Sequence, residues 1–279
     1  MDISERLIDL ALEEDIGPGD LTTGLLIGAG TRGTGRLIAR QKLVLAGMEV
    51  ARRVFRRLDP GAELADGLAD GQEAEAGQVL ARVSGKMQAL LQAERTALNF
   101  LQRLSGIATL TRRYVEALKA SGNASVRLVD TRKTTPGWRA LEKYAVRTGG
   151  GSNHRMGLFD GILIKDNHIA ACGTIAAAVA KARRGAGHLI KIEVEAEDLD
   201  QVRQALEAGA DVIMLDNMTP EQIGKAVDMI AGRALVEASG GVTLESLAEI
   251  AATGVDIISC GALTHSARAV DISMEIEAA

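Results

Sequence analysis

The sequence predicts an α/β protein in which a first third of mixed helices and strands precedes an incomplete α/β barrel. Six short apolar runs follow residue 126, and helical segments separate the later ones. The last four runs begin at residues 189, 212, 234 and 255, so they are 23, 22 and 21 residues apart. This close alternation is typical of a parallel sheet with crossover helices. Because a complete barrel has eight strands and only six runs are present, we expect the barrel to be incomplete.

The composition is that of a soluble globular protein. Of the 279 residues, 47% are hydrophobic and 25% are charged, which is enough apolar surface to form a core. The formal net charge is −5, and only six residues are aromatic. A mildly acidic chain with few aromatic rings is poorly suited to nucleic acid or to an anionic membrane surface. We therefore expect neither a nucleic-acid partner nor a membrane partner.

The cysteines, the first residues and the apolar runs bear on where the protein is located. Cys172 and Cys260 are too few and too far apart for a disulfide scaffold or a thiolate zinc site. Asp2, Glu5 and Asp9 lie where a signal peptide would carry Lys or Arg. No apolar run approaches the roughly 18–20 residues of a membrane span. We expect a cytoplasmic protein.

The first third alternates short helical and extended segments. Apolar residues at helical spacing predict a helix over 3–14, which ends in the turn-rich segment 15–20. We expect a strand over 34–46 and a short helix over 48–58. Between residues 66 and 85, several Asp-Gly, Ala-Gly and Ser-Gly pairs flank an apolar run, which predicts a small antiparallel β structure.

A long helical pattern from residue 87 to residue 119 closes this part of the chain. Ser105 and Gly106 interrupt it, and we interpret this pair as the boundary between two helices.

The second part is predicted from its apolar runs. We expect strands over residues 126–129, 161–164, 189–192, 212–215, 234–236 and 255–258. We expect helices at about 174–184, 198–208, 220–231 and 244–252. The third of these helices has a strong start signal, because Thr219 is a good N-cap and Pro220 suits the first helical position.

Polar residues follow every one of the six runs. In a parallel α/β barrel the chemistry lies at the C-terminal ends of the strands, so six polar ends predict one shared active site. The cationic members are Arg132, Lys133, Arg155 and Lys165, with His154 and His168 as further donors. The acidic members are Glu195 and Asp216, with Glu193 and Glu237 as weaker candidates.

These charges indicate two kinds of ligand. Cations bind carboxylates, and arginine does so with two parallel hydrogen bonds. Carboxylates on successive strands suit Mg²⁺, which is normally shared with substrate phosphates. Taken singly, residues 131–135 could be a solvated loop, and Glu195 or Asp216 could be a helix cap. Lys165 resists such an interpretation, because it directly follows three apolar residues and an unpaired buried ammonium is costly.

Three glycine-rich turns accompany these residues. Gly149-Gly-Gly151 precedes the basic segment 152–155, and glycines there suit close approach of the backbone to a ligand. Ser239-Gly-Gly241 and Cys260-Gly-Ala262 follow the last two strands, where barrels often bind phosphate through backbone N–H groups. We assign no site role to His188 or His265, and we interpret Trp138 as a packing residue.

Longer motifs extend this pattern along most of the chain. They begin with Glu14-Asp-Ile-Gly-Pro-Gly-Asp-Leu-Thr-Thr23 and are densest at Asp130-Thr-Arg-Lys-Thr-Thr-Pro-Gly137. The others occupy residues 94–102, 104–109, 141–146, 149–155, 163–168, 193–195, 215–217, 237–241 and 261–266. In this order they closely resemble the quinolinate phosphoribosyltransferase family, also called nicotinate-nucleotide pyrophosphorylase (carboxylating).

The resemblance implies a fold and an activity. The family has an N-terminal α/β sandwich domain, which corresponds to residues 1–110 joined by 267–279, and an incomplete α/β barrel, which corresponds to 111–266. Its members are glycosyltransferases of the pentosyltransferase class. They convert quinolinate and phosphoribosyl pyrophosphate to nicotinate mononucleotide, pyrophosphate and CO₂ with Mg²⁺, in NAD biosynthesis.

The resemblance also implies roles for individual residues. Quinolinate would be held by Thr131, Arg132, Lys133, His154, Arg155 and Lys165. Glu195 and Asp216 would face the ribose and the metal, and with Lys133 and Lys165 they would be the catalytic residues. The 5′-phosphate would bind at two turns, made of Ser239, Gly240 and Gly241 and of Cys260, Gly261 and Ala262. The family works as a homodimer in which each site receives an arginine from the partner, and Arg95 matches that arginine.

Three other functions remain open at this point. A paralogous molybdenum-transport-associated protein shares the Thr-Arg-Lys and Gly-Gly-Gly motifs, although Glu94-Arg-Thr96 and Lys165-Asp-Asn-His168 favour the quinolinate enzyme. A lyase could use Lys165 to form a Schiff base. A non-catalytic ligand sensor could retain the same pocket.

Overall fold

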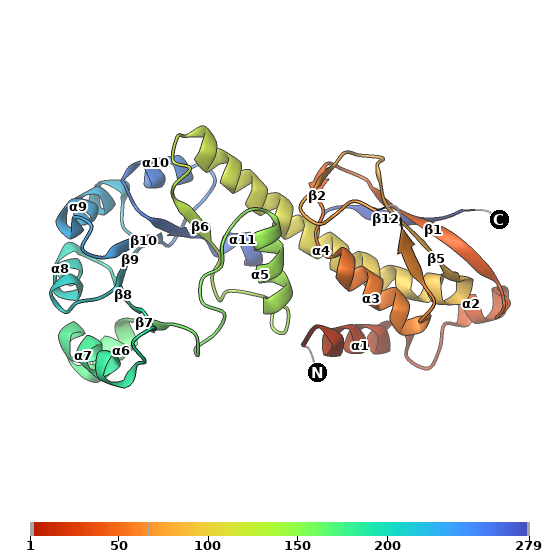
Figure 1. Ribbon diagram of the computed structural model, residues 1–279, viewed down its shortest axis with the longest axis horizontal. Coiled ribbons are helices and arrows are strands. Elements are labelled where there is room, and N and C mark those ends of the chain that lie inside the picture. Colours follow the sequence, from red (N-terminus) through yellow and green to blue (C-terminus); the bar gives the residue numbers. More distant parts are fainter. Residues whose placement is uncertain (1–2, 66, 278–279) are drawn as a thin grey trace. The chain divides into compact units, whose positions relative to one another are not determined.

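The computed structural model describes residues 3–65 and 67–277, and the chain divides into two compact units (Figure 1). The first unit comprises residues 1–112, 134–150 and 266–279, and the second comprises 113–133 and 151–265. The first contains an antiparallel sheet and the second a parallel sheet, which confirms the predicted fold class. The division agrees with the expected domain boundaries within two residues, except that segment 134–150 belongs to the first unit.

The first unit places helices on a small antiparallel sheet. Its strands are β1 (Arg32–Ala39), β3 (Glu63–Ala65), β5 (Val79–Lys86) and β12 (Ile272–Glu277), in the order β12-β1-β5-β3, and β2 (Leu43–Val44) pairs separately with β4 (Glu73–Ala74). Its helices are α1 (Ile3–Ile16), α2 (Leu21–Leu26), α3 (Met48–Leu58), α5 (Arg139–Thr148) and most of α4 (Met87–Ala120). Helix α1 packs on α3, which in turn contacts β3.

The strand expected over 34–46 is in fact two strands. The chain bends at Arg40, whose backbone N–H donates to the carbonyl of Asp271 at 2.9 Å and whose guanidinium pairs with Glu275. Strand β1 therefore stays in the four-stranded sheet, whereas β2 leaves it to pair with β4.

Helix α4 corrects the prediction of two helices, because it runs for 34 residues without a break. The Ser105 hydroxyl accepts the N–H of Ala46 at 3.0 Å and donates to the Ala46 carbonyl at 3.2 Å. A Cβ atom on Gly106 would lie 2.2 Å from the carbonyl oxygen of Arg268. Both small residues let other segments pack closely on the helix. Close packing therefore explains why a serine and a glycine occur here, and the helix does not end at them. In the part of the chain that is described, no helix, α4 included, is both long and apolar enough to cross a membrane.

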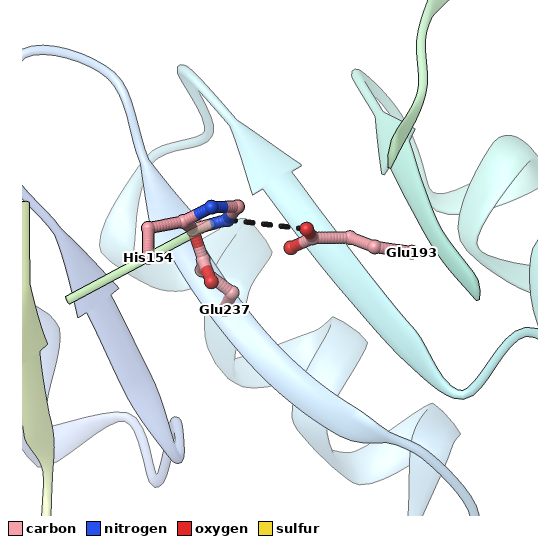
Figure 2. A group of neighbouring side chains, drawn as sticks. All are labelled: His154, Glu193 and Glu237. Atoms are coloured by element: carbon pink, nitrogen blue, oxygen red, sulfur yellow. Dashed lines mark ion pairs between the residues drawn. The ribbon is translucent and has the colours of Figure 1, made fainter. Parts of the chain in front are cut away.

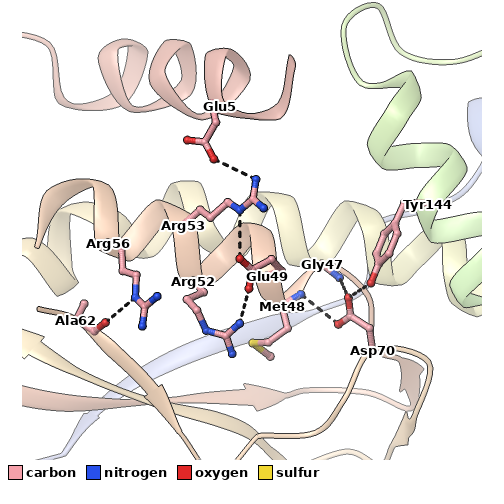
Figure 3. A network of polar contacts seen from close by, with 10 residues as sticks. All are labelled: Glu5, Gly47, Met48, Glu49, Arg52, Arg53, Arg56, Ala62, Asp70 and Tyr144. Carbon is pink, nitrogen blue, oxygen red and sulfur yellow. Dashed lines mark hydrogen bonds and ion pairs between the residues drawn. The ribbon is translucent and has the colours of Figure 1, made fainter. Parts of the chain in front are cut away.

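A carboxylate fixes the start of α3 (Figure 3). Asp70 accepts the backbone N–H groups of Gly47 and Met48 at 2.8 and 3.1 Å, which satisfies two donors of the first helical turn. The Tyr144 hydroxyl from α5 donates to the same carboxylate at 2.6 Å. Burial and the neighbouring Asp70 raise the pKa of Tyr144 to about 12, so the phenol remains a donor at physiological pH. This contact ties α5 to the loop before β4.

A buried ion pair joins α4 to α5. Glu142 is fully buried, and its carboxylate accepts Nε and Nη2 of Arg103 at 3.1 and 2.7 Å. It also accepts the backbone N–H and the hydroxyl of Thr135, at 3.1 and 2.8 Å. With four donors around it, the carboxylate is stabilised without water. Nearby in the same unit, Trp138 stacks on Phe100 with ring centroids 4.6 Å apart, as expected of a packing residue.

The second unit is built on six parallel strands. They are β6 (Arg127–Val129), β7 (Ile162–Ile164), β8 (Ile192–Ala196), β9 (Val212–Asp216), β10 (Leu235–Ser239) and β11 (Ile257–Ser259), in the order β6-β11-β10-β9-β8-β7. In a closed barrel β6 and β7 would be neighbours. Here they are the two edges of the sheet, and a single bridge between Val129 and Ser152 lies beside β6. The barrel is therefore incomplete, as predicted.

Short helices connect these strands, and Figure 1 shows α7 to α10 along one side of the sheet. The helices are α6 (Asp166–Cys172), α7 (Ile175–Gly185), α8 (Leu199–Glu207), α9 (Pro220–Ile230), α10 (Leu247–Ala252) and α11 (Ala262–His265). Helices α7 to α10 match the predicted ones within three residues at each end, and Thr219 caps α9 as expected. Helices α6 and α11 are too short for periodicity to reveal them.

One strand prediction is displaced. The run 189–192 is mostly a turn, in which Leu189 is 83% exposed, and β8 begins only at Ile192. Glu193 and Glu195 therefore lie inside the strand. Being two residues apart, they project from the same face of the sheet.

We predict that Gly106→Ala destabilises the protein although alanine favours helix. The new methyl group would collide with the backbone at Arg268, so we expect unfolding in urea to require about 1–3 kcal/mol less free energy. Gly224 of α9 is the matched control, because a Cβ atom there has nothing within 4 Å. Gly224→Ala should be neutral or stabilise by up to about 1 kcal/mol. Equal effects of the two changes would show that Gly106 is not required for packing.

Candidate active site

A pocket of about 500 Å³ lies at the carboxyl ends of the parallel strands. It is the place where the sequence predicted a shared site. Among the predicted residues, those that line it are Thr131, Arg132, Lys133, His154, Arg155, Lys165, Glu195, Asp216, Ser239, Gly240 and Gly241. The turn formed by Cys260, Gly261 and Ala262 is not part of this lining, and Arg95 lies on α4 in the first unit.

The basic segment after β6 is held by backbone contacts. The Lys133 N–H donates to the Thr131 hydroxyl at 3.0 Å, and the Lys133 carbonyl accepts the buried Thr264 hydroxyl at 2.8 Å. The stem of the Lys133 side chain passes the α-carbon of Gly261, since a Cβ atom there would lie 3.2 Å from Lys133 Cδ. Glycine at 261 therefore leaves room for the lysine.

Asp130 organises the second basic segment. Its side chain is fully buried at the end of β6, and it accepts the backbone N–H of His154 at 3.0 Å and the side-chain amide of Asn153. Arg155 continues this segment and donates from Nη1 to the carbonyl of Gly161 at 3.0 Å. Burial, together with the nearby Arg132, lowers the pKa of the Arg155 guanidinium. Two cations held this close favour an anion between them.

His154 lies against two buried carboxylates (Figure 2). Its Nε2 is 3.2 Å from Oε2 of Glu193 and 3.6 Å from Oε1 of Glu237. Its Nδ1 accepts the backbone N–H of Arg155 at 2.8 Å. An acceptor Nδ1 means that the neutral ring carries its proton on Nε2, which faces Oε2 of Glu193.

The same three side chains could be mistaken for a metal site, because their ligand atoms lie within 4.8 Å of one another. A metal-bound histidine uses one ring nitrogen as ligand and normally donates a proton from the other. In His154 the second nitrogen is an acceptor. The arrangement therefore fits a proton-holding cluster better than a metal centre.

Ionising both Glu193 and Glu237 at once is unfavourable in free energy. Burial, and then the adjacent Glu193, raises the pKa of Glu237 to about 7. Glu237 is 2% exposed and Glu193 is 7% exposed, so water screens neither. Glu237 consequently retains its proton over much of the range below neutrality.

Lys165 and Glu195 form an ion pair within the pocket. The lysine side chain is 43% exposed and the carboxylate side chain 11%, so the ammonium lies on the open side. His168, which the sequence grouped with the donors of the site, has a different contact. Its Nδ1 accepts the Lys165 backbone N–H at 3.0 Å and thereby helps to cap α6.

Asp216 and the glycine turn after β10 meet at Asn217. Asn217 Nδ2 donates to Oδ2 of Asp216 at 2.8 Å, and its backbone N–H donates to the Ser239 carbonyl at 2.9 Å. Gly240 and Gly241 have φ angles of +89° and +58°, which glycine adopts without strain. The carboxylate and the turn therefore form one continuous wall of the pocket.

The turn after β11 is built differently. Cys260 is buried, its thiol lies 3.5 Å from the Val242 carbonyl, and burial raises the pKa of that thiol. Such a thiol is unreactive, so any ligand contact at this turn would come from its backbone. The ring of His265 lies beside Gly261, where a Cβ atom would be 3.1 Å from its Nε2.

Sequence reasoning missed several residues around the pocket. Leu163 and Met214 line it without having been expected there, whereas Asn217 and Ser259 follow two of the apolar runs and line it without having been given a role. Asp130 accepts the backbone N–H of His154, which lines the pocket, and His265 lies beside the neighbouring turn at Gly261. Asp130 directly follows the first apolar run and so belongs to the expected polar strand ends, but no role was assigned to it from the sequence; a carboxylate there is costly to bury unless it is hydrogen-bonded. Leu163 and Met214 carry no such signal, because they belong to the apolar runs themselves.

The parallel sheet and its polar pocket define the chain as an α/β-barrel enzyme that acts on an anionic small molecule. A family model described as "Quinolinate phosphoribosyl transferase, C-terminal domain" matches residues 107–275, and its N-terminal counterpart matches residues 20–105. The chain belongs to the quinolinate phosphoribosyl transferase family.

Individual relatives agree with this assignment. The chain is 47% identical over 272 residues to the probable nicotinate-nucleotide pyrophosphorylase [carboxylating] of Bacillus subtilis. The matched region covers 98% of this chain and 93% of the relative. The solved nicotinate-nucleotide pyrophosphorylase of Francisella tularensis is 42% identical with a TM-score of 0.93, covering 99% of this chain and 96% of the other. The solved NadC of Streptococcus pyogenes is also 42% identical, with a TM-score of 0.93 and coverages of 98% and 96%.

We predict that Glu237 makes stability fall as pH rises. Its pKa is about 7 in the folded state against a reference of 4.5, so between these values the folded state holds a proton that the unfolded state has lost. The free energy of unfolding should therefore decrease from about pH 4.5 to pH 7, by roughly 3 kcal/mol. In Glu237→Gln this contribution to the slope should vanish, as measured by urea unfolding at several pH values. Glu207→Gln, on the exposed surface of α8, should keep the original slope.

Proposed function

We propose that this chain transfers a phosphoribosyl group to quinolinate and releases CO₂, forming nicotinate mononucleotide and pyrophosphate for NAD biosynthesis. The observation that carries the proposal is the composition of one pocket, where a cationic group, an acidic group and a glycine turn meet. Together, the two substrates quinolinate and phosphoribosyl pyrophosphate require all three of these features in one pocket.

The cationic side of the pocket suits quinolinate. Its pyridine ring carries two adjacent carboxylates, and Arg132, Lys133, Arg155 and Lys165 all line the pocket. Arginine and lysine bind carboxylates through charge-assisted hydrogen bonds. His154 contributes through its neighbour, because its Nδ1 fixes the backbone of Arg155.

The acidic side suits the second substrate. Glu195 and Asp216 lie at or next to the last residues of neighbouring strands and line the same pocket, and carboxylate oxygens are the ligands that Mg²⁺ prefers. We propose that these two residues hold Mg²⁺ together with the substrate phosphates, where the ion would neutralise the leaving pyrophosphate. The Ser239–Gly241 turn, and the neighbouring Cys260–Ala262 turn through its backbone, would receive the 5′-phosphate.

The reaction needs no nucleophilic side chain. The pyridine nitrogen attacks the anomeric carbon of the ribose, and the bond to pyrophosphate breaks with its electron pair leaving on oxygen. Carboxylates beside the ribose stabilise the oxocarbenium character that develops. The ribosylated nitrogen is positively charged, so the adjacent carboxylate leaves as CO₂. Its bonding electrons stay on the ring carbon, which then takes a proton from solvent.

The alternatives have less support. A Schiff-base lysine must be a neutral amine, usually in apolar surroundings, whereas Lys165 pairs with Glu195. The relatives are named as carboxylating pyrophosphorylases or quinolinate phosphoribosyltransferases. A ligand sensor would not need the full set of charged residues.

We also propose that the enzyme works as a homodimer with composite sites. Arg95 is exposed on α4, and its side chain makes no hydrogen bond or ion pair with any of the described residues. Leu21, Leu25 and Leu26 of α2 are 82%, 84% and 75% exposed, a cluster of apolar side chains that is typical of an interface.

The cytoplasmic location expected from the sequence stays a prediction.

We predict that the purified protein releases CO₂ from carboxyl-labelled quinolinate only when phosphoribosyl pyrophosphate and Mg²⁺ are both present. The cationic residues should discriminate by carboxylate number, so nicotinate, which lacks the second carboxylate, should be a poor substrate. Nucleotide formation from nicotinate at a rate equal to that from quinolinate would contradict the role given to the cations.

We predict that Arg95→Ala folds and dimerises but is nearly inactive. Loss of a charge-assisted bond to a substrate carboxylate should weaken binding by roughly 1.5–3 kcal/mol. Mixing this variant with Arg155→Ala should restore part of the activity, because one site of the heterodimer would carry both changes and the other neither. Arg113→Ala, an exposed arginine of the same helix, is the control and should remain active. If mass spectrometry shows subunit exchange and the mixture stays inactive, Arg95 does not act in the partner's site.

A further inference from the structure

Asn217 has an unusual backbone for its place in the fold. Its φ angle is +55°, and Ala231 is the one other non-glycine residue in the described part of the chain with a positive φ. Ala231 closes α9, where a left-handed residue commonly ends a helix. Asn217 instead follows β9 directly and lines the pocket. Such strain persists where surrounding contacts require it, and it is concentrated at functional sites.

The side chain of Asn217 contacts two parts of the pocket wall. Its Nδ2 donates to Oδ2 of Asp216 at 2.8 Å. Its Oδ1 lies against the next turn so closely that a Cβ atom on Gly240 would be 2.2 Å away. The backbone N–H of Asn217 also donates to the Ser239 carbonyl at 2.9 Å. One residue thus contacts both the carboxylate and the glycine turn.

These contacts are not required to fill a core. Asn217 is exposed, so shortening its side chain would leave no buried cavity. Glycine would adopt the same φ without strain, yet it would lose the amide. Oδ1 of Asp216 makes no hydrogen bond within the described residues, so the amide occupies one carboxylate oxygen and leaves the other available to a ligand.

We propose that Asn217 is a positioning residue for phosphoribosyl pyrophosphate: it orients the Asp216 carboxylate and sets the Ser239–Gly241 turn against it. The inference rests on the proposed function and adds a residue to it. The amide donates to the Asp216 carboxylate, so the carboxylate need not be ordered when the substrate binds. The same amide spaces the turn, whose N–H groups would meet a phosphate. Quinolinate, bound on the cationic side, should not depend on Asn217.

The test compares Asn217→Gly with Ala231→Gly. Both changes relieve a positive φ, but only the first removes an amide from the pocket. Binding of phosphoribosyl pyrophosphate with Mg²⁺ is measured by calorimetry without quinolinate, and binding of quinolinate is measured separately. We expect Asn217→Gly to weaken phosphoribosyl pyrophosphate binding roughly tenfold or more, since it loses a hydrogen bond to a charged group. Its quinolinate binding should change by less than about twofold and its melting temperature should not fall. Ala231→Gly should bind both ligands like the unaltered chain.

A double-mutant cycle tests the route through Asp216. If Asn217 acts on that carboxylate, Asn217→Gly should weaken binding less in an Asp216→Asn background than in the unaltered chain. Additive losses would overturn this part of the inference.

Three further results would overturn the proposal. Unchanged phosphoribosyl pyrophosphate binding by Asn217→Gly would show that the amide has no role. Parallel loss of both ligands with a lower melting temperature would show a merely structural role. Failure of the unaltered chain to bind phosphoribosyl pyrophosphate at all would overturn the proposed function, and this inference with it. The first two results would leave the proposed function intact.

Discussion

Charge that is removed from water must be paired, and this requirement organises the carboxyl edge of the parallel sheet. Asp130 is fully buried and is satisfied by the segment that carries His154. Glu193 and Glu237 are nearly as buried: Nε2 of His154 lies 3.2 Å from Glu193, and the raised pKa of Glu237 leaves that carboxyl uncharged below about pH 7. The first contact joins the end of β6 to the segment before β7, and the second joins that segment to β8. These polar contacts therefore have a structural role, because they hold the segments around the pocket in fixed positions relative to the strands.

The same requirement separates the charges of the pocket into two roles. Some are neutralised within the protein, as in the ion pair of Lys165 with Glu195. Others, such as the ammonium of Lys133, have no ion-pair partner among the described residues and are left to a ligand. A substrate with two carboxylates supplies the missing counter-charge on one side. A polyphosphate with its cation supplies it on the other.

The architecture could be predicted from the sequence because apolar periodicity reflects burial, and burial differs sharply between strands and connecting helices. The exact positions of the element boundaries were harder to predict. Leu189 is apolar but exposed, so the third strand was expected three residues too early. Gly106 was interpreted as a helix boundary although a neighbouring backbone explains it. The charged residues of the pocket could be named from their places after the runs. Asn217 also follows a run, but its role could not be predicted, because that role depends on a backbone angle and on a glycine 23 residues away, which only the folded chain brings together.

The pairing of β1 with β12 has a consequence for synthesis. Arg36 and Glu275 are 239 positions apart, yet they are partners in adjacent strands of the first unit. A ribosome that has produced the first 112 residues has therefore not yet produced an edge strand of their sheet. The second unit, by contrast, is formed from residues 113–133 and 151–265 and can assemble its six strands earlier. During translation the N-terminal part of the chain is thus the last to be completed, and until then the edge of β1 that later meets β12 is exposed to other chains.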